Sequence, residues 1–268
     1  MNKIRTVCTH VFLSIASFIS IFPFFWMIVG MTNSSTDIVK GKLTFGSELI
    51  TNISNFLSSV NLGSVLWTSI KISVCGTFST LLLCSMAGYA FEIYKSKFKS
   101  RLMALLMLSM MMPFAALMVP LFKMFSGLNL MNTAIAVVLP SVATVFMIFF
   151  FLQNTKSFPT DLLQSARVDG LNEFQAFFYI FMPTMKSTYA AAAIITFMSY
   201  WNSYLWPLIV LQTQDNKTMP LIISSLASAY SPDYGMIMVA IVITTIPTLL
   251  IFFLMQKHFV EGMVGAVK

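Results

Sequence analysis

The charged side chains with the clearest capacity for recognition gather in one short polar stretch, residues 160–183, which lies between two apolar segments. This stretch carries Asp161, Arg167, Asp169 and Glu173. Charged side chains so close together between two apolar segments are suited to contact with a partner outside the bilayer. We therefore take this stretch as the candidate functional site.

The other residue types that carry chemistry are scattered. Cys8, Cys75 and Cys84 lie in or beside apolar runs without metal-ligand spacing, and His10 and His258 lie near opposite ends of the chain. On one helix Cys75 and Cys84 would be separated by roughly 13 Å of axial rise, too far for a disulfide. We expect no metal site and no catalytic triad. The chain also has no Gly-x-x-x-x-Gly-Lys-Ser/Thr phosphate loop, so we expect it to hydrolyse no nucleotide.

Two short helices would position the charged stretch. Thr160, after a proline, suits the start of a helix over 161–168, and Gly170 suits its end because glycine adopts the left-handed conformation readily. Asn172 and Gln175 have the spacing of a capping box for a second helix, which we expect Pro183 to interrupt. The phenylalanines of this second helix are Phe174, Phe177, Phe178 and Phe181.

The composition indicates an integral membrane protein. Hydrophobic residues make up 57% and charged residues 9% of the 268 residues, and the mean hydropathy is +0.83. A soluble domain would carry about 25% charged residues. The net charge of +7 comes with basic residues in short loops, so it favours a topological interpretation over nucleic-acid binding.

About six segments have the length and apolarity to span a bilayer, and they form one transmembrane domain over residues 1–268. The polar stretch 32–64 has only a weak structural pattern, and Pro113, Pro120 and Pro140 would kink the spans that contain them. The apolar run after Lys3 and Arg5 lacks a small-residue cleavage site, so we expect a retained span rather than a signal peptide. The expected spans are 12–31, 66–91, 102–125, 133–152, 189–211 and 235–255.

The distribution of basic residues predicts the orientation. Six spans divide the loops between two sides, and the side with the larger basic excess is cytoplasmic. Both termini and the loop 156–187 then face the cytoplasm, with the second helix of the loop along the membrane surface. The cytoplasmic set is Lys3, Arg5, Lys95, Lys97, Lys99, Arg101, Lys156, Arg167, Lys186, Lys257 and Lys268, and the opposite set is Lys40, Lys42, Lys71, Lys123 and Lys217.

The polar loop resembles a known family. Its sequence Gln164-Ser165-Ala166, then Asp169-Gly170, then Met182-Pro183 is similar to the Glu-Ala-Ala…Gly…Leu-Pro loop of ABC importer permeases. The resemblance implies that the loop forms coupling helices that dock into a cleft on an ATP-hydrolysing subunit, with Ala166 packed in that cleft. Gln164 replaces the family's glutamate, so it can hydrogen-bond there but cannot form the ion pair. The alternative is an interfacial linker that only joins two spans.

The C-terminus carries a second resemblance. Residues 256–268 are similar to the tail of carbohydrate permeases, which ends near Gly-Ala-Val-Lys-Gly. The resemblance implies a tail that extends between the ATPase subunits, with Glu261, Gly262, Gly265 and Lys268 in contact with them. The two glycines allow an extended path, and the alternative is a frayed end.

Aromatic and amide side chains near the end of the fifth span are candidates for the translocation pathway. Trp201, Asn202 and Tyr204 combine rings that stack on sugars with a polar group that is costly at membrane depth unless it faces a wet cavity. The alternative is an interfacial aromatic belt, and for Trp206 we favour that alternative.

The outer loop 212–234 is too apolar for a plain solvated linker. In the resembling carbohydrate importers the corresponding loop contacts the extracellular sugar-binding protein, which implies this role for Met219, Pro220, Tyr230 and Asp233. The alternative is a loop that packs over its own helices.

These patterns predict an all-α, multi-pass permease subunit of a type I ABC importer for carbohydrates, in the inner (cytoplasmic) membrane of a bacterium. The resemblance implies a heterodimer with a second permease, two ATPase subunits that hold ATP and Mg, and a periplasmic or extracellular sugar-binding protein. The chain itself is expected to bind no cofactor and no nucleic acid and to be no enzyme. One alternative is a type I permease for an amino acid, phosphate or a polyamine. The other is an ion-coupled secondary transporter, which the near absence of ionisable residues within the spans disfavours.

Overall fold

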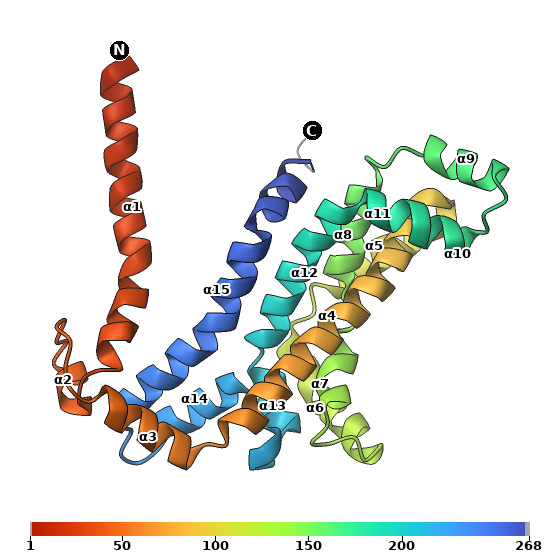
Figure 1. The fold of residues 1–268 in the computed structure, drawn as a ribbon. Coiled ribbons are helices and arrows are strands. Elements are labelled where there is room, and N and C mark those ends of the chain that lie inside the picture. The colour runs from red at the N-terminus through yellow and green to blue at the C-terminus, as the bar shows by residue number, and fades with distance from the viewer. Residues whose placement is uncertain (1, 266–268) are drawn as a thin grey trace. The chain divides into compact units, whose positions relative to one another are not determined.

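The structure is a computed structural model that describes residues 2–265, and these residues form helices and connecting segments without a strand (Figure 1). Shorter 3-10 turns span Leu139–Ser141 and Gln214–Asn216, and a π-helix spans Phe177–Phe181. The α-helices are α1 (Asn2–Gly30), α2 (Ser35–Val39), α3 (Leu49–Ser59), α4 (Leu62–Ile93), α5 (Lys97–Ser109), α6 (Phe114–Gly127), α7 (Ala134–Val138), α8 (Val145–Thr155), α9 (Asp161–Val168), α10 (Glu173–Ala176), α11 (Met182–Thr184), α12 (Lys186–Trp201), α13 (Leu205–Val210), α14 (Met219–Ala227) and α15 (Tyr234–Gly265).

Among the described residues, three helices are long and apolar enough to cross a bilayer: α1 over Arg5–Gly30, α4 over Leu62–Ile93, and α15 over Tyr234–Leu254. Two helix pairs meet the same test together but are bent, α5 with α6 by 96° and α7 with α8 by 50°. The candidates therefore number three, or five if each bent pair is one span. The first, second and last expected spans correspond to α1, α4 and α15.

The third and fourth expected spans are bent pairs of helices, and the kinks expected around Pro113 and Pro140 are confirmed. The chain leaves helix after Ser109 and starts α6 after Pro113, which has no N–H to continue the α5 ladder. Pro120 lies inside α6 without ending it. The fourth span bends after the 3-10 turn that contains Pro140.

The fifth expected span is broken as well. Helix α12 has 16 residues and stops at Trp201, and α13 starts at Leu205. Asn202 closes α12, because both its backbone N–H and its side-chain Nδ2 donate to the Met198 carbonyl, at 3.1 and 2.9 Å. The Asn202 amide thus adds a side-chain hydrogen bond at the end of α12.

The chain divides into two compact units. The first comprises Met1–Leu62 and Met219–Pro247. Here the polar stretch after α1 is more ordered than expected, with α2 and α3 in place of irregular chain. Asn52 of α3 is buried and donates to the carbonyls of Met31 and Asn33 at 2.9 and 3.0 Å. A Cβ on Gly235 would lie 2.4 Å from the Asn52 Oδ1, so glycine is needed for this contact.

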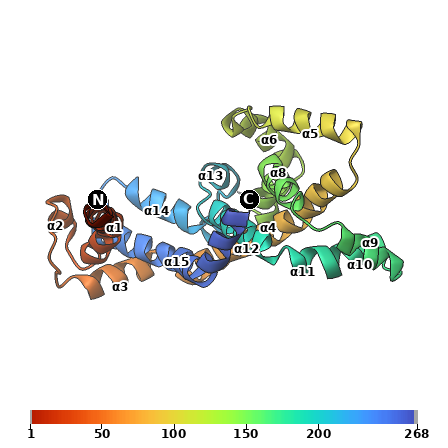
Figure 2. The same cartoon turned by 90° about the horizontal axis from the view of Figure 1, so that it is seen from above.

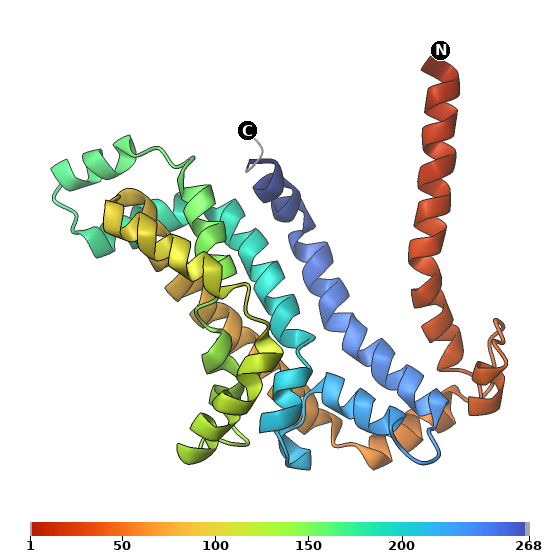
Figure 3. The same cartoon turned by 180° about the vertical axis from the view of Figure 1, so that it is seen from behind.

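The second unit comprises Gly63–Thr218 and Thr248–Lys268, and its core is built where α4 meets α8 and α12. Small residues on α4 permit the contact: a Cβ on Gly88 would lie 2.6 Å from Phe151 of α8, and one on Gly76 would lie 2.7 Å from Tyr200 of α12. Figure 3 shows α4, α8 and α12 side by side. Buried Cys84 lies in the same core. Figure 2 shows α9, α10 and α11 running out from the ends of α8 and α12.

Candidate functional site

Helix α9 carries the first half of the candidate loop, as predicted. Thr160 stands directly before its first residue, as predicted, in a helical conformation and without a side-chain cap. Leu163 and Ala166, three residues apart, are 1% and 4% exposed and form the buried face of α9. Val168, on the other face, is 87% exposed.

The burial of Ala166 corrects the packing expected for it. Its side chain lies inside this chain and not in a surface open to a partner. A larger side chain at this position would therefore clash within the loop first. The exposed residues of the Gln-Ser-Ala segment are Gln164 and Ser165, and Asp169 is exposed beside them.

Gly170 ends α9 in the left-handed conformation, with φ of +83°. The N–H of Leu171 donates to the Ala166 carbonyl at 3.0 Å, and that of Gly170 donates to the Arg167 carbonyl at 3.1 Å. These two bonds form a Schellman motif, which satisfies carbonyls that the helix end would leave free. The prediction for Gly170 is confirmed.

The capping box is also confirmed. Asn172 Oδ1 accepts from the Gln175 N–H, and Gln175 Oε1 accepts from the Asn172 N–H, both at 2.9 Å. This reciprocal pair starts α10 directly after the turn at Gly170. The turn and the box together fix the direction in which the second helix leaves the first.

The second helix does not stop at Pro183, contrary to expectation. It continues as a π-helix over Phe177–Phe181 and then as α11 to Thr184. In the wider turn the Met182 N–H donates to the Phe177 carbonyl, so the chain is already out of the α-helical ladder when it reaches the proline without an N–H. The break falls at Met185, and Pro183 itself is exposed.

An aromatic cluster fastens the loop to α4. The ring of Tyr89 on α4 lies 5.3 Å from that of Phe177 and 4.8 Å from that of Phe181, and Phe158 lies 5.3 Å from Phe181. Leu163 of α9 is buried in the same cluster. Edge-to-face contacts of this kind add to the free energy of burying the rings.

A polar contact joins the same elements at the surface. Arg167 on α9 donates to Glu173 on α10 through Nε at 2.8 Å and Nη2 at 3.3 Å. The hydroxyl of Tyr94, just after α4, donates to Oε2 of Glu173. Arg167 and then Tyr94 lower the pKa of Glu173, and burial together with this hydrogen bond raises the pKa of Tyr94. We call Tyr94, Arg167 and Glu173 the polar clasp.

Sequence reasoning missed the role of Tyr94 and Tyr89. The contacts join residues far apart in the chain, and Tyr94 and Glu173 are separated by 79 positions. The only signal was the presence of Tyr89 and Tyr94 near the end of the second apolar segment. The charges of Arg167 and Glu173 were noted without their pairing.

The loop leaves large apolar side chains uncovered. Phe174 is 68% exposed, Tyr179 70% and Phe178 42%. Phe174 belongs to α10 and Phe178 and Tyr179 to the π-helix, while Val168 and Gln164 are exposed on α9. Exposed apolar groups of this size mark interaction surfaces.

Two of the three residues expected in the translocation pathway line a cavity of about 400 Å³ within the second unit. Asn202 and Tyr204 contribute to it, together with Phe114 and Ser141. Trp201 is 1% exposed and stacks on Phe197 with ring centroids 5.7 Å apart, so it packs inside the protein. Trp201 is thus not among the residues that line this cavity, and its expected place in the translocation pathway stays a prediction.

Trp206 is not a belt residue. Its side chain is 3% exposed, and Nε1 donates to the Ala136 carbonyl at 2.8 Å. The rings of Phe114 and Phe125 lie 6.2 and 5.8 Å from it. A ring held inside by a hydrogen bond at its polar edge is a core residue, and the interfacial role that we favoured was wrong.

The outer loop contains α14, which the sequence pattern did not predict. Met219 starts this helix fully buried, and Pro220 follows it half-buried. Asp233 accepts at Oδ1 from the Met236 N–H at 3.2 Å and from Ser35 Oγ at 3.1 Å, and so caps the start of α15. Tyr230 is fully exposed and is the member of this set most open to a partner.

The expected tail lies at the end of α15. The helix continues to Gly265, so Glu261, Gly262 and Gly265 are helical and not in the extended path expected for them. Lys268 lies outside the described residues. A glycine inside a helix disfavours it without preventing it.

The chain is similar to known proteins over its whole length. Residues 80–265 match the family described as binding-protein-dependent transport system inner membrane component. The chain is 52% identical to the lactose transport system permease protein LacG of Rhizobium radiobacter over 267 residues, which cover 100% of this chain and 98% of that protein. It is 34% identical to the arabinooligosaccharides transport system permease protein AraQ of Bacillus subtilis (strain 168), with 99% of this chain and 97% of that protein covered.

The fold has a solved counterpart. The crystal structure of a bacterial ABC transporter involved in the import of the acidic polysaccharide alginate matches with a TM-score of 0.84 over 96% of this chain and 97% of that chain. Its sequence is 17% identical, so this likeness concerns the fold. The chain therefore belongs to the binding-protein-dependent transport system inner membrane component family and has the all-helical fold of type I ABC importer permeases.

Proposed function

We propose that this chain is the membrane-spanning permease subunit of an ATP-driven importer for a sugar, with a disaccharide of the lactose type as its substrate. The observation that carries this proposal is the 52% identity to a lactose permease across the full length of both chains. The relative at 34% identity transports arabino-oligosaccharides by its name, so a larger oligosaccharide is the second candidate.

The proposed topology places both termini and the α9–α11 loop in the cytoplasm of a bacterial cell. The basic residues near Lys95 and Arg101 and those of the loop support it, since basic residues are retained on the cytoplasmic side. Six crossings follow if the bent pairs α5–α6 and α7–α8 each cross once and the broken pair α12–α13 crosses once as well.

The proposed mechanism is alternating access driven from the loop. A partner ATPase, which holds ATP and Mg, would grip the exposed face of α9 and α10 around Gln164, Ser165 and Asp169. The aromatic cluster and the polar clasp would carry its movement into α4, because both connect the loop directly to that helix. Movement of α4 would then open the cavity beside Asn202 and Tyr204 alternately to each side of the membrane.

The proposed assembly contains a second permease, two ATPase subunits and a sugar-binding protein. The family description supports the binding protein, since it specifies binding-protein-dependent transport. Tyr230 and the surface around α14 are the proposed contact with that protein, and the end of α15 from Glu261 onward is the proposed contact with the ATPases.

Uptake by the purified assembly tests the proposal. The complex would be isolated in mild detergent, reconstituted into liposomes that contain ATP, and given radiolabelled lactose, an arabino-oligosaccharide or glutamine with the cognate binding protein outside. We expect uptake of a sugar that requires both ATP and the binding protein. Uptake that needs an ion gradient and no ATPase, or uptake of the amino acid alone, would refute it.

A further inference from the structure

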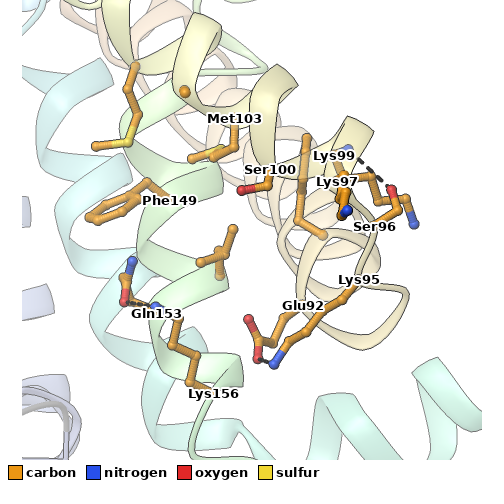
Figure 4. A pocket seen from close by; sticks show the side chains of 14 residues that line it. Glu92, Lys95, Ser96, Lys97, Lys99, Ser100, Met103, Phe149, Gln153 and Lys156 are labelled. Carbon is orange, nitrogen blue, oxygen red and sulfur yellow. Dashed lines mark hydrogen bonds and ion pairs between the residues drawn. The ribbon is translucent and has the colours of Figure 1, made fainter.

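A basic cavity of about 670 Å³ lies within the second unit, between the turn that joins α4 to α5 and the C-terminal half of α8 (Figure 4). The transport mechanism proposed above does not use it. Ligand sites in proteins have volumes of this order, roughly 300–1,000 Å³. The side chains that line it come from Phe91, Glu92, Lys95, Ser96, Lys97, Lys99, Ser100, Met103, Ala104, Met107, Phe149, Leu152, Gln153 and Lys156.

The charges of the cavity favour an anion. Four lysines and one glutamate line it, a net formal charge of +3. The glutamate, Glu92, is already paired with Lys95 at 2.5 Å. Lys156 donates to the neutral Gln153 Oε1 at 2.8 Å, and Lys99 donates to the Ala90 carbonyl at 3.0 Å. Those two ammonium groups thus bind neutral acceptors and keep their charge available.

The start of α5 adds to the positive potential. Ser96 caps this helix of 13 residues, because its Oγ accepts from the Lys99 N–H at 3.2 Å. Lys97 occupies the first position of the helix and lines the cavity. The positive end of a helix favours phosphate, and here it stands beside the four lysines.

The other end of the cavity is apolar. Figure 4 shows Met103 and Phe149 at one end and the pair Glu92–Lys95 with Lys156 at the other. Beyond the cavity, Leu105 and Leu108 of α5 are 63% and 60% exposed, which suits contact with acyl chains. A free phosphate would make no favourable contact with this apolar half, whereas the headgroup and acyl chains of a phospholipid match both halves.

We propose that this cavity binds an anionic phospholipid, with the headgroup phosphate between Lys97 and Lys156 and an acyl chain along Met103 and Phe149. Basic recesses at the cytoplasmic ends of membrane helices suit such headgroups. The proposal goes beyond the transport function and uses only its topology, in which this end of α4 faces the cytoplasm. Binding of the lipid would hold the α4–α5 turn against α8.

Native mass spectrometry of the purified full complex tests this proposal. The complex is delipidated and titrated with phosphatidylglycerol or phosphatidylcholine of equal chain length. We expect at least one phosphatidylglycerol to bind that phosphatidylcholine does not replace. The variant Lys97→Gln/Lys156→Gln should bind phosphatidylglycerol roughly tenfold or more weakly, since each lysine near an anionic lipid contributes about a fivefold effect.

A matched control removes the same charge elsewhere. Lys123→Gln/Lys217→Gln lies outside the cavity, and we expect it to bind phosphatidylglycerol as the wild type does. Equal binding of the two lipids by the wild type, or an equal loss in both double variants, would overturn the proposal. Displacement of the lipid by millimolar inorganic phosphate would overturn it too, because it would assign the site to free phosphate.

The wild-type comparison does not depend on the folding of any variant. Raising the salt concentration should reduce the preference for phosphatidylglycerol over phosphatidylcholine, since the contact is between charges. A preference that is insensitive to salt would contradict a phosphate held by lysines. None of these measurements requires sugar uptake, so failure of this proposal and failure of the proposed transport function are distinguishable.

Discussion

Replacement of Gly170 by valine should reduce transport, because it strains the backbone at the turn between α9 and α10. The φ of Gly170 is +83°, and a Cβ built there meets no atom within 4 Å. The cost is therefore conformational and not steric. An L-residue in the left-handed region costs about 1–2 kcal/mol, and a β-branched one is at the upper end. A cost of ~2 kcal/mol lowers the population of the turn by a factor of about 30.

Sugar uptake in reconstituted liposomes, normalised to the amount of permease in the membrane, measures this effect. We expect Gly170→Val to lower uptake by up to about thirtyfold without lowering the amount inserted. Gly170→Asn should retain most of the activity, because asparagine tolerates the left-handed conformation better than other residues.

Two other glycines serve as matched controls. A Cβ on Gly127 also meets nothing within 4 Å, but its φ is not positive, so Gly127→Val introduces the side chain without this strain. Gly41 has φ of +73° and equally open space outside the loop, so Gly41→Val introduces the strain elsewhere. Normal uptake by Gly170→Val, or an equal loss in Gly41→Val, would refute the reasoning.

Four further predictions concern the attachment of the loop and the core beneath it. Glu173→Gln should lower the free energy that holds the loop in place by less than about 1 kcal/mol, since the pair of Glu173 with Arg167 is exposed. Unchanged amide hydrogen exchange in α9 would contradict this prediction. In the wild type, the pKa of Glu173 is lowered in the folded loop, so the ion pair stabilises the loop above the ordinary pKa of 4.5. This stabilisation is lost as the pH falls through the lower folded pKa, so amide hydrogen exchange in α9 should be faster only in acid. Phe181→Ala should lower the free energy of unfolding by about 3–5 kcal/mol and increase the rate of proteolysis of the loop, because Phe181 is fully buried. Resistance to proteolysis equal to that of the wild type would contradict a stabilising role of the aromatic cluster. Gly88→Val should lower the unfolding temperature, because a Cβ would lie 2.6 Å from Phe151, and an unchanged temperature would contradict the close contact.

Local signals in the sequence predicted the ends of the loop helices correctly. Gly170 and the pair Asn172–Gln175 form their hydrogen bonds within five residues of chain, so the sequence nearby contains the whole motif. The same holds for the long apolar helices α1, α4 and α15, whose hydropathy alone sets them apart.

The bends of the apolar segments could not be predicted from hydropathy. The segments around Pro113 and Pro140 are apolar throughout, so a count of apolar residues does not register a change of direction between two short helices. Prolines in membrane helices commonly produce kinks, but Pro120 leaves α6 unbroken while Pro113 stands at a bend of 96°.

Contacts across the chain account for the errors at single residues. Ala166 was assigned to a partner's cleft from the resemblance to the family's loop, but its side chain is buried within this chain. Trp206 was assigned to the membrane interface because tryptophan is common there, yet its indole N–H finds the Ala136 carbonyl, 70 residues away in the sequence. In both cases the residue type was informative about packing and uninformative about the partner.

The geometry of the loop indicates how much Gln164, which replaces the family's glutamate, would weaken the proposed docking. The charges of Arg167 and Glu173 are already paired within this chain, so they are less available to a docking subunit. What remains on the surface is largely apolar, with Phe174 and Tyr179 about two-thirds exposed. Burial of one such ring contributes about 1.5–3 kcal/mol, whereas an exposed ion pair contributes about 0–1 kcal/mol. The loss of one carboxylate is thus smaller than the contribution of either ring, and the docking that we propose for this surface would not depend on an ion pair at Gln164.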